Sequence, residues 1–132
     1  MRKSLLRLAL VAFALACGCG SASGQVSHSG VVGRVLAGPT CPVERVPPDT
    51  GCAPRPLAAR LRITRTGGSA SGRVVRSGSD GRFRVELGPG RYTITPLRRA
   101  GSPFPRPGPP QTVTVRPGHY SRVTVTYDTG IR

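Results

Sequence analysis

Few side chains in this sequence could do acid–base chemistry near neutral pH. His28 and His119 are the two histidines that could act as general bases. The five carboxylates are Glu44, Asp49, Asp80, Glu86 and Asp128. There is no Gly-x-Ser-x-Gly elbow, no His-Glu-x-x-His zinc motif and no phosphate-binding Gly-rich loop. We therefore expect no catalytic residue, no cofactor, no metal site and no small-molecule substrate. A small hydrolase, the weakest hypothesis, would require His119 to meet a carboxylate in a cleft.

The beginning of the chain has the layout of a secretory signal peptide. Arg2, Lys3 and Arg7 precede an apolar run of nine residues, 8–16, which ends in a stretch of small residues. A helix that spans a membrane needs roughly 20 apolar residues, so we expect export without a permanent transmembrane segment.

Two cysteines at the end of this leader could carry a lipid anchor. Cys17 and Cys19 each follow small residues, as the acylated cysteine of a bacterial lipobox does, although neither has the usual residues before it. Acylation at Cys19 discards Cys17 and leaves an even number of cysteines, whereas acylation at Cys17 leaves Cys19 as a free thiol in an oxidising space. We predict lipidation at Cys19, with Cys17 as the alternative. Ordinary cleavage after Ala16 or Ser23, which would give a freely secreted protein, stays open.

The other two cysteines, Cys41 and Cys52, lie in a Pro-rich stretch of the exported part. A metal site needs four ligands, and no histidine is near this pair in the sequence. A redox pair would prefer Cys-x-x-Cys. The compartment and the spacing therefore predict a structural disulfide between Cys41 and Cys52. The surrounding loop could be a rigid binding surface or a brace that keeps a long insertion from fraying.

The charge of the chain is strongly positive. Lys and Arg number 20 against five Asp and Glu, and loss of Arg2, Lys3 and Arg7 with the leader leaves a net charge of +12, almost all of it from arginine. Such a protein is drawn to anionic surfaces such as lipid headgroups or acidic wall polymers. The alternative interpretation is that the arginines, which are spread along the chain, only solvate strand faces. Export and the shortage of aromatic residues disfavour nucleic acid.

Apolar residues alternate with polar ones along most of the chain from residue 30, as in strands with one buried face. The clearest runs are 57–64, 82–87, 112–116 and 122–127, and weaker ones are 31–37, 72–76 and 91–97. We predict an all-β fold of about seven short strands, arranged as two antiparallel sheets in a β-sandwich. The Pro-rich stretches Gly38–Pro56 and Arg98–Pro110 cannot be central strands.

The predicted organisation has three parts: a signal peptide over 1–19, a flexible tether over 20–29 and one folded domain over 30–132. Inside the domain, Gly78–Gly81 predicts a tight connection, and Gly88–Arg91, with Pro second and Gly third, predicts a type II turn. Phe83, Tyr92 and Tyr127 fall on apolar faces and are expected in the core.

The segment 79–92, Ser-Asp-Gly-Arg-Phe-Arg-Val-Glu-Leu-Gly-Pro-Gly-Arg-Tyr, resembles the carboxypeptidase regulatory-like domain, a prealbumin-like (transthyretin-like) β-sandwich. That family has Thr/Ser-Asp, a short turn, Gly-x-Phe, an alternating strand and Leu-Pro-Pro-Gly-x-Tyr. The segment 30–35 resembles its opening Gly-x-Val strand, so the likeness covers about residues 30–127. It implies a hairpin whose Phe83 and Tyr92 enter the core from neighbouring strands. Gly81 directly follows Asp80, so the turn here is tighter than in the family, and the loop 38–56 resembles an elaboration of small exported actinobacterial proteins.

The resemblance implies an accessory or adhesion module that does no chemistry itself, since the zinc peptidase of the family's name is a separate domain. Related pilin and collagen-adhesin domains use a Lys–Asn isopeptide bond. This chain has no asparagine, and its one lysine, Lys3, lies in the predicted signal peptide, so the mature part cannot form such a bond. The Tyr-Arg-Gly-Ser end of transthyretin-like hydrolases is not matched by 127–130. The leading hypothesis is a non-enzymatic envelope lipoprotein that contacts an envelope protein or an anionic wall polymer and binds no nucleic acid. The rival is a freely secreted polycation that coats acidic polymers.

Overall fold

The alternating runs form strands in the computed structural model of the chain, which describes residues 28–43, 45–68 and 71–132. The predicted signal peptide and both anchor candidates, Cys17 and Cys19, lie outside this part. No described segment is a helix with the length and hydropathy to cross a bilayer. The longer strands are β1 (Gly30–Gly38), β3 (Arg60–Arg65), β4 (Arg73–Arg76), β5 (Arg82–Glu86), β6 (Gly90–Pro96), β8 (Gln111–Val115) and β9 (Tyr120–Asp128).

The two Pro-rich stretches contribute only two-residue strands, β2 (Arg55–Pro56) and β7 (Arg106–Pro107), and one 3-10 turn, η1 (Thr50–Cys52). Both strands lie at the ends of the order β2-β1-β9-β7, as expected for segments that lack backbone donors. The expected strand over 57–64 is divided between the sheets. Residues 55 and 56 pair with β1, Leu57 donates its N–H to the Val35 carbonyl, and β3 begins in the other sheet at Arg60.

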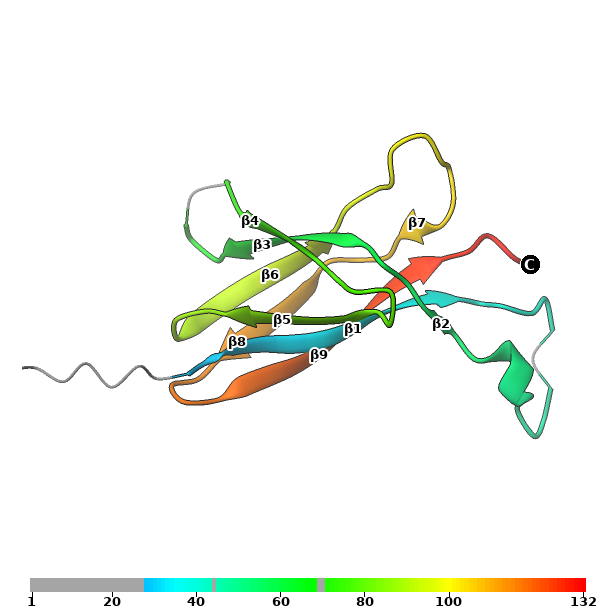
Figure 1. Ribbon diagram of the computed structural model, residues 1–132, viewed down its shortest axis with the longest axis horizontal. Helices are drawn as coiled ribbons and strands as arrows, with labels where there is room; N and C mark the ends of the chain where they lie inside the picture. The colour runs from blue at the N-terminus through cyan, green and yellow to red at the C-terminus, as the bar shows by residue number, and fades with distance from the viewer. Residues whose placement is uncertain (1–27, 44, 69–70) are drawn as a thin grey trace, which may run out of the picture.

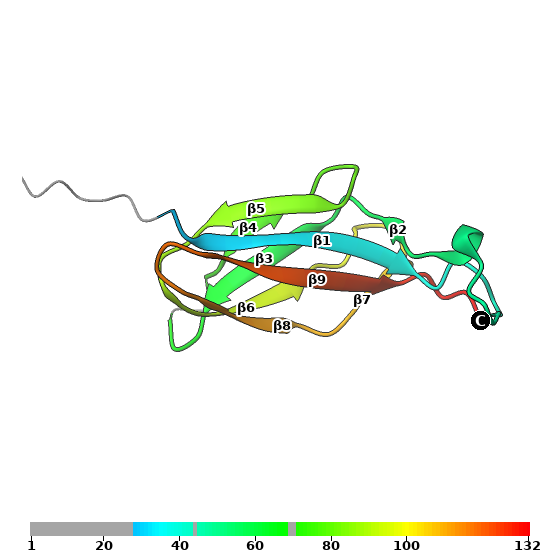
Figure 2. The same ribbon diagram turned by 90° about the horizontal axis from the view of Figure 1, so that it is seen from below.

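The strands form a β-sandwich, which confirms the predicted fold class (Figure 1). One sheet has the order β2-β1-β9-β7, with β5 also paired to β1, and the other has the order β4-β3-β6-β8. Figure 2 shows the β5-β1-β9 layer in front of β4, β3 and β6. The described chain starts at one end of the sandwich and finishes at the opposite end.

One strand pair departs from the predicted antiparallel arrangement. β1 and β9 are parallel, in a register that runs from Gly30 opposite Tyr120 to Gly38 opposite Asp128. Alternation of apolar residues shows that one face of a strand is buried, but it carries no information on the direction of the neighbouring strand. Parallel neighbours need a long connection, and here the rest of the domain provides it.

The core lies between the sheets and is built from the apolar residues of the alternating runs. The most deeply buried side chains are Val31, Val35, Leu61, Ile94, Val125 and Tyr127. The three aromatic residues expected in the core, Phe83, Tyr92 and Tyr127, are all buried. Ser29 is also buried and bonds to Leu87 through both its hydroxyl and its carbonyl, so the folded part begins before Gly30.

The predicted hairpin between β5 and β6 is wrong. β5 pairs with β1 and β6 pairs with β3 and β8, so the chain crosses from one sheet to the other at 87–89, and Phe83 and Tyr92 reach the core from opposite sides. Gly90 has φ +152°, which is far from the value near +80° of a type II turn. A Pro-Gly sequence fixes a local bend, but the partners of the flanking strands decide whether that bend lies within one sheet. The tight turn at Gly78–Gly81 is confirmed by a 2.9 Å hydrogen bond from Gly81 N–H to the Gly78 carbonyl.

The close packing of β1 against β5 and β9 generates a stability prediction at Gly33. A Cβ there would lie 2.6 Å from the Phe83 ring and 2.5 Å from the Val123 carbonyl oxygen. We expect Gly33→Ala to lower the free energy of unfolding by about 1–3 kcal/mol because the core has no room for the methyl group. Urea denaturation measures this, with Gly88→Ala, where nothing lies within 4 Å, as the control. Equal effects of the two variants would contradict the packing argument.

Candidate functional site

The predicted disulfide is present in the loop that follows β1. The sulfur atoms of Cys41 and Cys52 are 2.07 Å apart and their Cα atoms 5.2 Å apart. Next to it, Asp49 Oδ1 accepts the N–H of Gly51 at 2.8 Å, and Thr40 Oγ1 donates to the Ala53 carbonyl at 3.2 Å. These contacts hold the loop to itself, as expected for a brace. Glu44, one of the five carboxylates, lies outside the described residues.

The two histidines are not brought together with a set of catalytic groups. His119 is exposed in the turn before β9, and its imidazole makes no hydrogen bond or ion pair with the described residues. His28 Nδ1 lies 3.5 Å from Glu86 Oε1, and both side chains are about two-thirds exposed. The described chain holds no group of three His, Cys, Asp or Glu residues that could bind a metal ion. The hydrolase hypothesis therefore gains no support from the geometry.

A cluster of charged side chains lies on the outer face of β5, β1 and β9. It borders an open hollow of about 860 Å³. Its cations, which we call the arginine face, are Arg34, Arg82, Arg84 and Arg122.

The register places these arginines in two rows across the sheet. Arg82 and Arg34 stand directly opposite each other, and Thr124 of β9 completes their row. In the next row Val32 lies between Arg84 and Arg122. Two residues along a strand span about 7 Å, so the two rows are separated by about that distance.

The arginines point outward because their neighbours point inward. On β5, Phe83 and Val85 are buried, so Arg82 and Arg84 face solvent. On β1, Val31 and Val35 are buried on the inner face, and Arg34 lies on the outer face and is exposed. Sequence reasoning treated such arginines as solvated strand faces and did not identify a cluster. The Arg-Phe-Arg pattern indicated that Arg82 and Arg84 lie on the same side of β5. That these two arginines lie next to those of β1 and β9 depends on which strands pair.

The arginine face carries an excess of positive charge. Arg34 and Arg82 lie directly opposite each other, and like charges in that position destabilise a sheet. The one carboxylate among the residues that line the hollow is Asp80, whose Oδ2 lies 3.8 Å from Arg82 Nε in an exposed pair. Arg84 instead stacks on an aromatic ring, its guanidinium carbon 3.7 Å from the centroid of Tyr120. Within the described chain Arg34 and Arg122 form no ion pair, so their charges are available to an anion.

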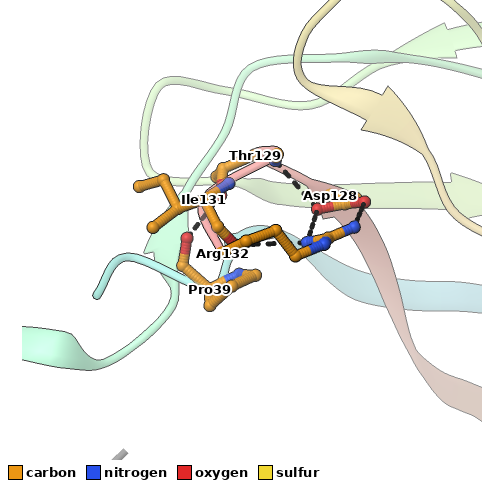
Figure 3. A network of polar contacts seen from close by, with 6 residues as sticks. Pro39, Asp128, Thr129, Ile131 and Arg132 are labelled. Atoms are coloured by element: carbon orange, nitrogen blue, oxygen red, sulfur yellow. Dashed lines mark hydrogen bonds and ion pairs between the residues drawn. The ribbon is translucent and has the colours of Figure 1, made fainter. Parts of the chain in front are cut away.

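A second polar network lies where the end of β9 meets the loop that follows β1 (Figure 3). Arg132 donates to both oxygens of Asp128, at 3.2 and 2.9 Å, and the hydroxyl of Thr129 donates to the Pro39 carbonyl. The hydrogen bond from Arg132 lowers the pKa of Asp128 to about 2, with the Gly130 N–H as the next cause. Deeper in the domain, burial raises the pKa of Tyr127. This network holds residues 128–132 against the loop that follows β1.

Comparisons with known proteins bear on the fold. No family model and no curated protein matches the sequence. Among solved structures, the chain is similar to a minor pilin of the Gram-positive pathogen Streptococcus agalactiae, with a TM-score of 0.54 and 14% sequence identity. The match covers 77% of this chain and 44% of the pilin chain, so the chain spans less than half of that protein. The likeness supports the β-sandwich, and membership of the carboxypeptidase regulatory-like family stays a prediction.

The ion pair at the end of the chain generates a pH prediction. The pKa of Asp128 is about 2 in the fold and 3.8 in its absence, so the pair stabilises the fold above pH 3.8 and this contribution is lost as the pH falls through about 2. We expect Arg132→Gln to raise the pKa of Asp128 toward 3.8, measured by NMR titration of the carboxyl carbon. Arg116→Gln removes the same charge at the other end of the sandwich and should leave that pKa in place. A pKa unchanged in Arg132→Gln would show that the pair does not form.

Proposed function

We propose that the chain is an exported, non-enzymatic β-sandwich module of the cell envelope, anchored through a lipidated Cys19, whose arginine face contacts an acidic polymer of the wall. The arginine face carries this proposal, because it presents two rows of cations around a hollow with one carboxylate among the lining residues. Guanidinium groups bind phosphate and carboxylate oxygens in bidentate fashion.

The surroundings of the arginine face favour a polymer over a lipid bilayer. Proteins that lie on a membrane surface insert apolar side chains between the headgroups. The large exposed apolar residues of the described chain, Val43, Val46, Val74, Phe104 and Ile131, do not line the hollow. Its apolar lining residues, Val32, Phe83 and Val123, belong to the sheet itself, and none of them is an exposed large side chain that could insert between headgroups. A chain with regularly spaced anionic groups could instead lie across the two rows of arginines and contact both at once.

The position of the tether is compatible with this role. β1 starts at Gly30, two residues before Val32, which lines the hollow beside the arginine face, so the predicted tether joins the domain near that face. Because Ser29 belongs to the folded part, the tether would have about eight residues, and a flexible chain of that length has a root-mean-square length of about 16 Å. An anchored domain would therefore hold the arginine face close to the membrane, and the Cys41–Cys52 loop, at the far end of β1, would point away from it (Figure 1). The likeness in fold to a minor pilin supports a structural role.

A freely secreted protein is the second candidate, since the leader also offers ordinary cleavage sites at Ala16 and Ser23. Intact mass of the exported chain distinguishes the two. We expect a membrane-bound product that begins at Cys19 and carries a diacylglyceryl group, with Cys41 and Cys52 resistant to alkylation until reduction. Cys19→Ser should release the protein into the medium, and Cys17→Ser should leave it anchored. An unmodified soluble product of the unaltered gene would contradict the anchor.

Binding to a defined polyanion tests the arginine face. In the variant Arg34→Gln, Arg84→Gln, Arg122→Gln we expect at least a tenfold loss of affinity for poly(glycerol phosphate) at physiological salt. The slope of log K against log salt should fall by about 2, since each phosphate contact contributes about 0.7–0.9. The control variant Arg62→Gln, Arg91→Gln, Arg116→Gln loses the same charge elsewhere and should change affinity by less than twofold. Equal losses in both variants would support a diffuse polycation without a binding face, which is the secreted-polycation alternative.

A further inference from the structure

A smaller pocket on the other sheet has the features of a site for one anion. It has a volume of about 290 Å³ and lies where β3 and β4 meet the segment that follows β6. Four arginines line it: Arg60, Arg76, Arg98 and Arg99. No carboxylate is among the lining residues, and none of the four arginines forms an ion pair within the described chain. We refer to it as the arginine pocket.

The backbone beneath the arginine pocket is fixed from the core. Leu97 N–H donates to the Arg60 carbonyl at 2.9 Å, which joins the two segments that form its floor. The hydroxyl of Tyr127, a residue that is 1% exposed, reaches across the sandwich to the carbonyls of Leu97 and Arg60, at 2.8 and 3.4 Å. A buried side chain of the opposite sheet therefore holds both segments in place.

The other side of the arginine pocket is fixed in the same way. Ser77, which is 3% exposed and follows Arg76, accepts the Ala59 N–H at 2.9 Å and donates to the Leu57 carbonyl at 2.9 Å. Arg60 and Arg76 stand directly opposite each other on β3 and β4. The positions of their Cα atoms are thus set by buried hydrogen bonds, so little ordering of the backbone would be needed for a ligand to bind.

The charge and the size of the arginine pocket define the class of ligand. Two arginines directly opposite each other repel, and two more approach from the segment after β6, so an anion would replace repulsion by attraction. Four guanidinium groups match an oxyanion with several charged oxygens better than a single carboxylate. The volume of about 290 Å³ is just below the range for small-molecule pockets, about 300–1,000 Å³, which suits one such group with a small substituent.

We propose that the arginine pocket binds one phosphate or sulfate group, either as the free ion or as the terminal group of a small molecule. This site is separate from the arginine face, because its arginines belong to β3, β4 and the segment after β6. The proposal therefore stands or falls independently of polymer binding.

Titration of the exported chain, with its disulfide intact, tests the arginine pocket. The probes are inorganic phosphate, sulfate, glycerol phosphate and acetate at constant ionic strength, followed by calorimetry and by the arginine Nε–H signals in NMR spectra. We expect saturable binding of the tetrahedral anions, with shifts confined to Arg60, Arg76, Arg98 and Arg99. Tighter binding of glycerol phosphate than of phosphate would identify a phosphorylated molecule as the ligand, and the reverse order would identify the free ion. Acetate that binds as tightly as phosphate, or titrations without saturation, would overturn the proposal.

Three variants distinguish binding in the arginine pocket from nonspecific attraction to the positive charge of the domain. Arg98→Gln with Arg99→Gln should weaken phosphate binding at least tenfold, and Arg62→Gln with Arg91→Gln, which removes the same charge outside the arginine pocket, should change it by less than twofold. Ala58→Leu keeps every charge but places a larger side chain in the arginine pocket, where Ala58 is a lining residue, so it should also weaken binding. Circular dichroism checks that each variant is folded. Equal losses in the two arginine variants, or full binding by Ala58→Leu, would show that the arginine pocket is not the site.

Discussion

The parallel pairing of β1 and β9 is the constraint on which the rest of the structure depends. It joins the first and last strands of the domain over nine residue pairs, from Gly30–Tyr120 to Gly38–Asp128. Because of this register, Val31 and Val35 are buried in the same layer as Val125 and Tyr127. The same pairing brings Arg122 into line with Val32 on the outside of the sheet. A change of register by one residue would turn the apolar side chains of β9 outward and separate the arginines, so the core and the arginine face are set by one interaction.

The surplus of arginine shapes the outer surface on both sheets. With five carboxylates for 20 basic residues in the whole sequence, most guanidinium groups have no acidic partner to meet. Several lie over aromatic rings: Arg84 is 3.7 Å from the Tyr120 centroid, Arg106 is 4.6 Å from that of Phe104 and Arg65 is 5.8 Å from that of Tyr92. Such contacts hold an arginine side chain in place without neutralising it. The described surface therefore keeps most of its positive charge.

The motif that resembles the carboxypeptidase regulatory-like domain is informative on burial and misleading on connectivity. Phe83 and Tyr92 are both in the core, as the resemblance implies. The Pro-Gly segment between them nevertheless carries the chain from one sheet to the other and is not the turn of a hairpin. The hydroxyl of Tyr92 donates to the Gly88 carbonyl at 2.8 Å and so ties the start of β6 to this crossing. A match in local sequence can therefore coincide with the correct core positions while the strand partners differ from those expected.

The sequence by itself determined the positions of most strands, the faces they bury and the disulfide between Cys41 and Cys52, because alternation and cysteine spacing are local properties. It also indicated that Arg82, Arg84 and Arg122 would point outward, since they alternate with apolar residues. Tertiary structure alone decided which strands are neighbours, that β1 and β9 run parallel, and that residues 87–89 cross between sheets. It likewise decided that Arg60, Arg76, Arg98 and Arg99 line one pocket, next to a Leu97 carbonyl that accepts the hydroxyl of Tyr127. The physical reason is that pairing depends on contacts between residues far apart in the chain, which the period of a single strand does not encode.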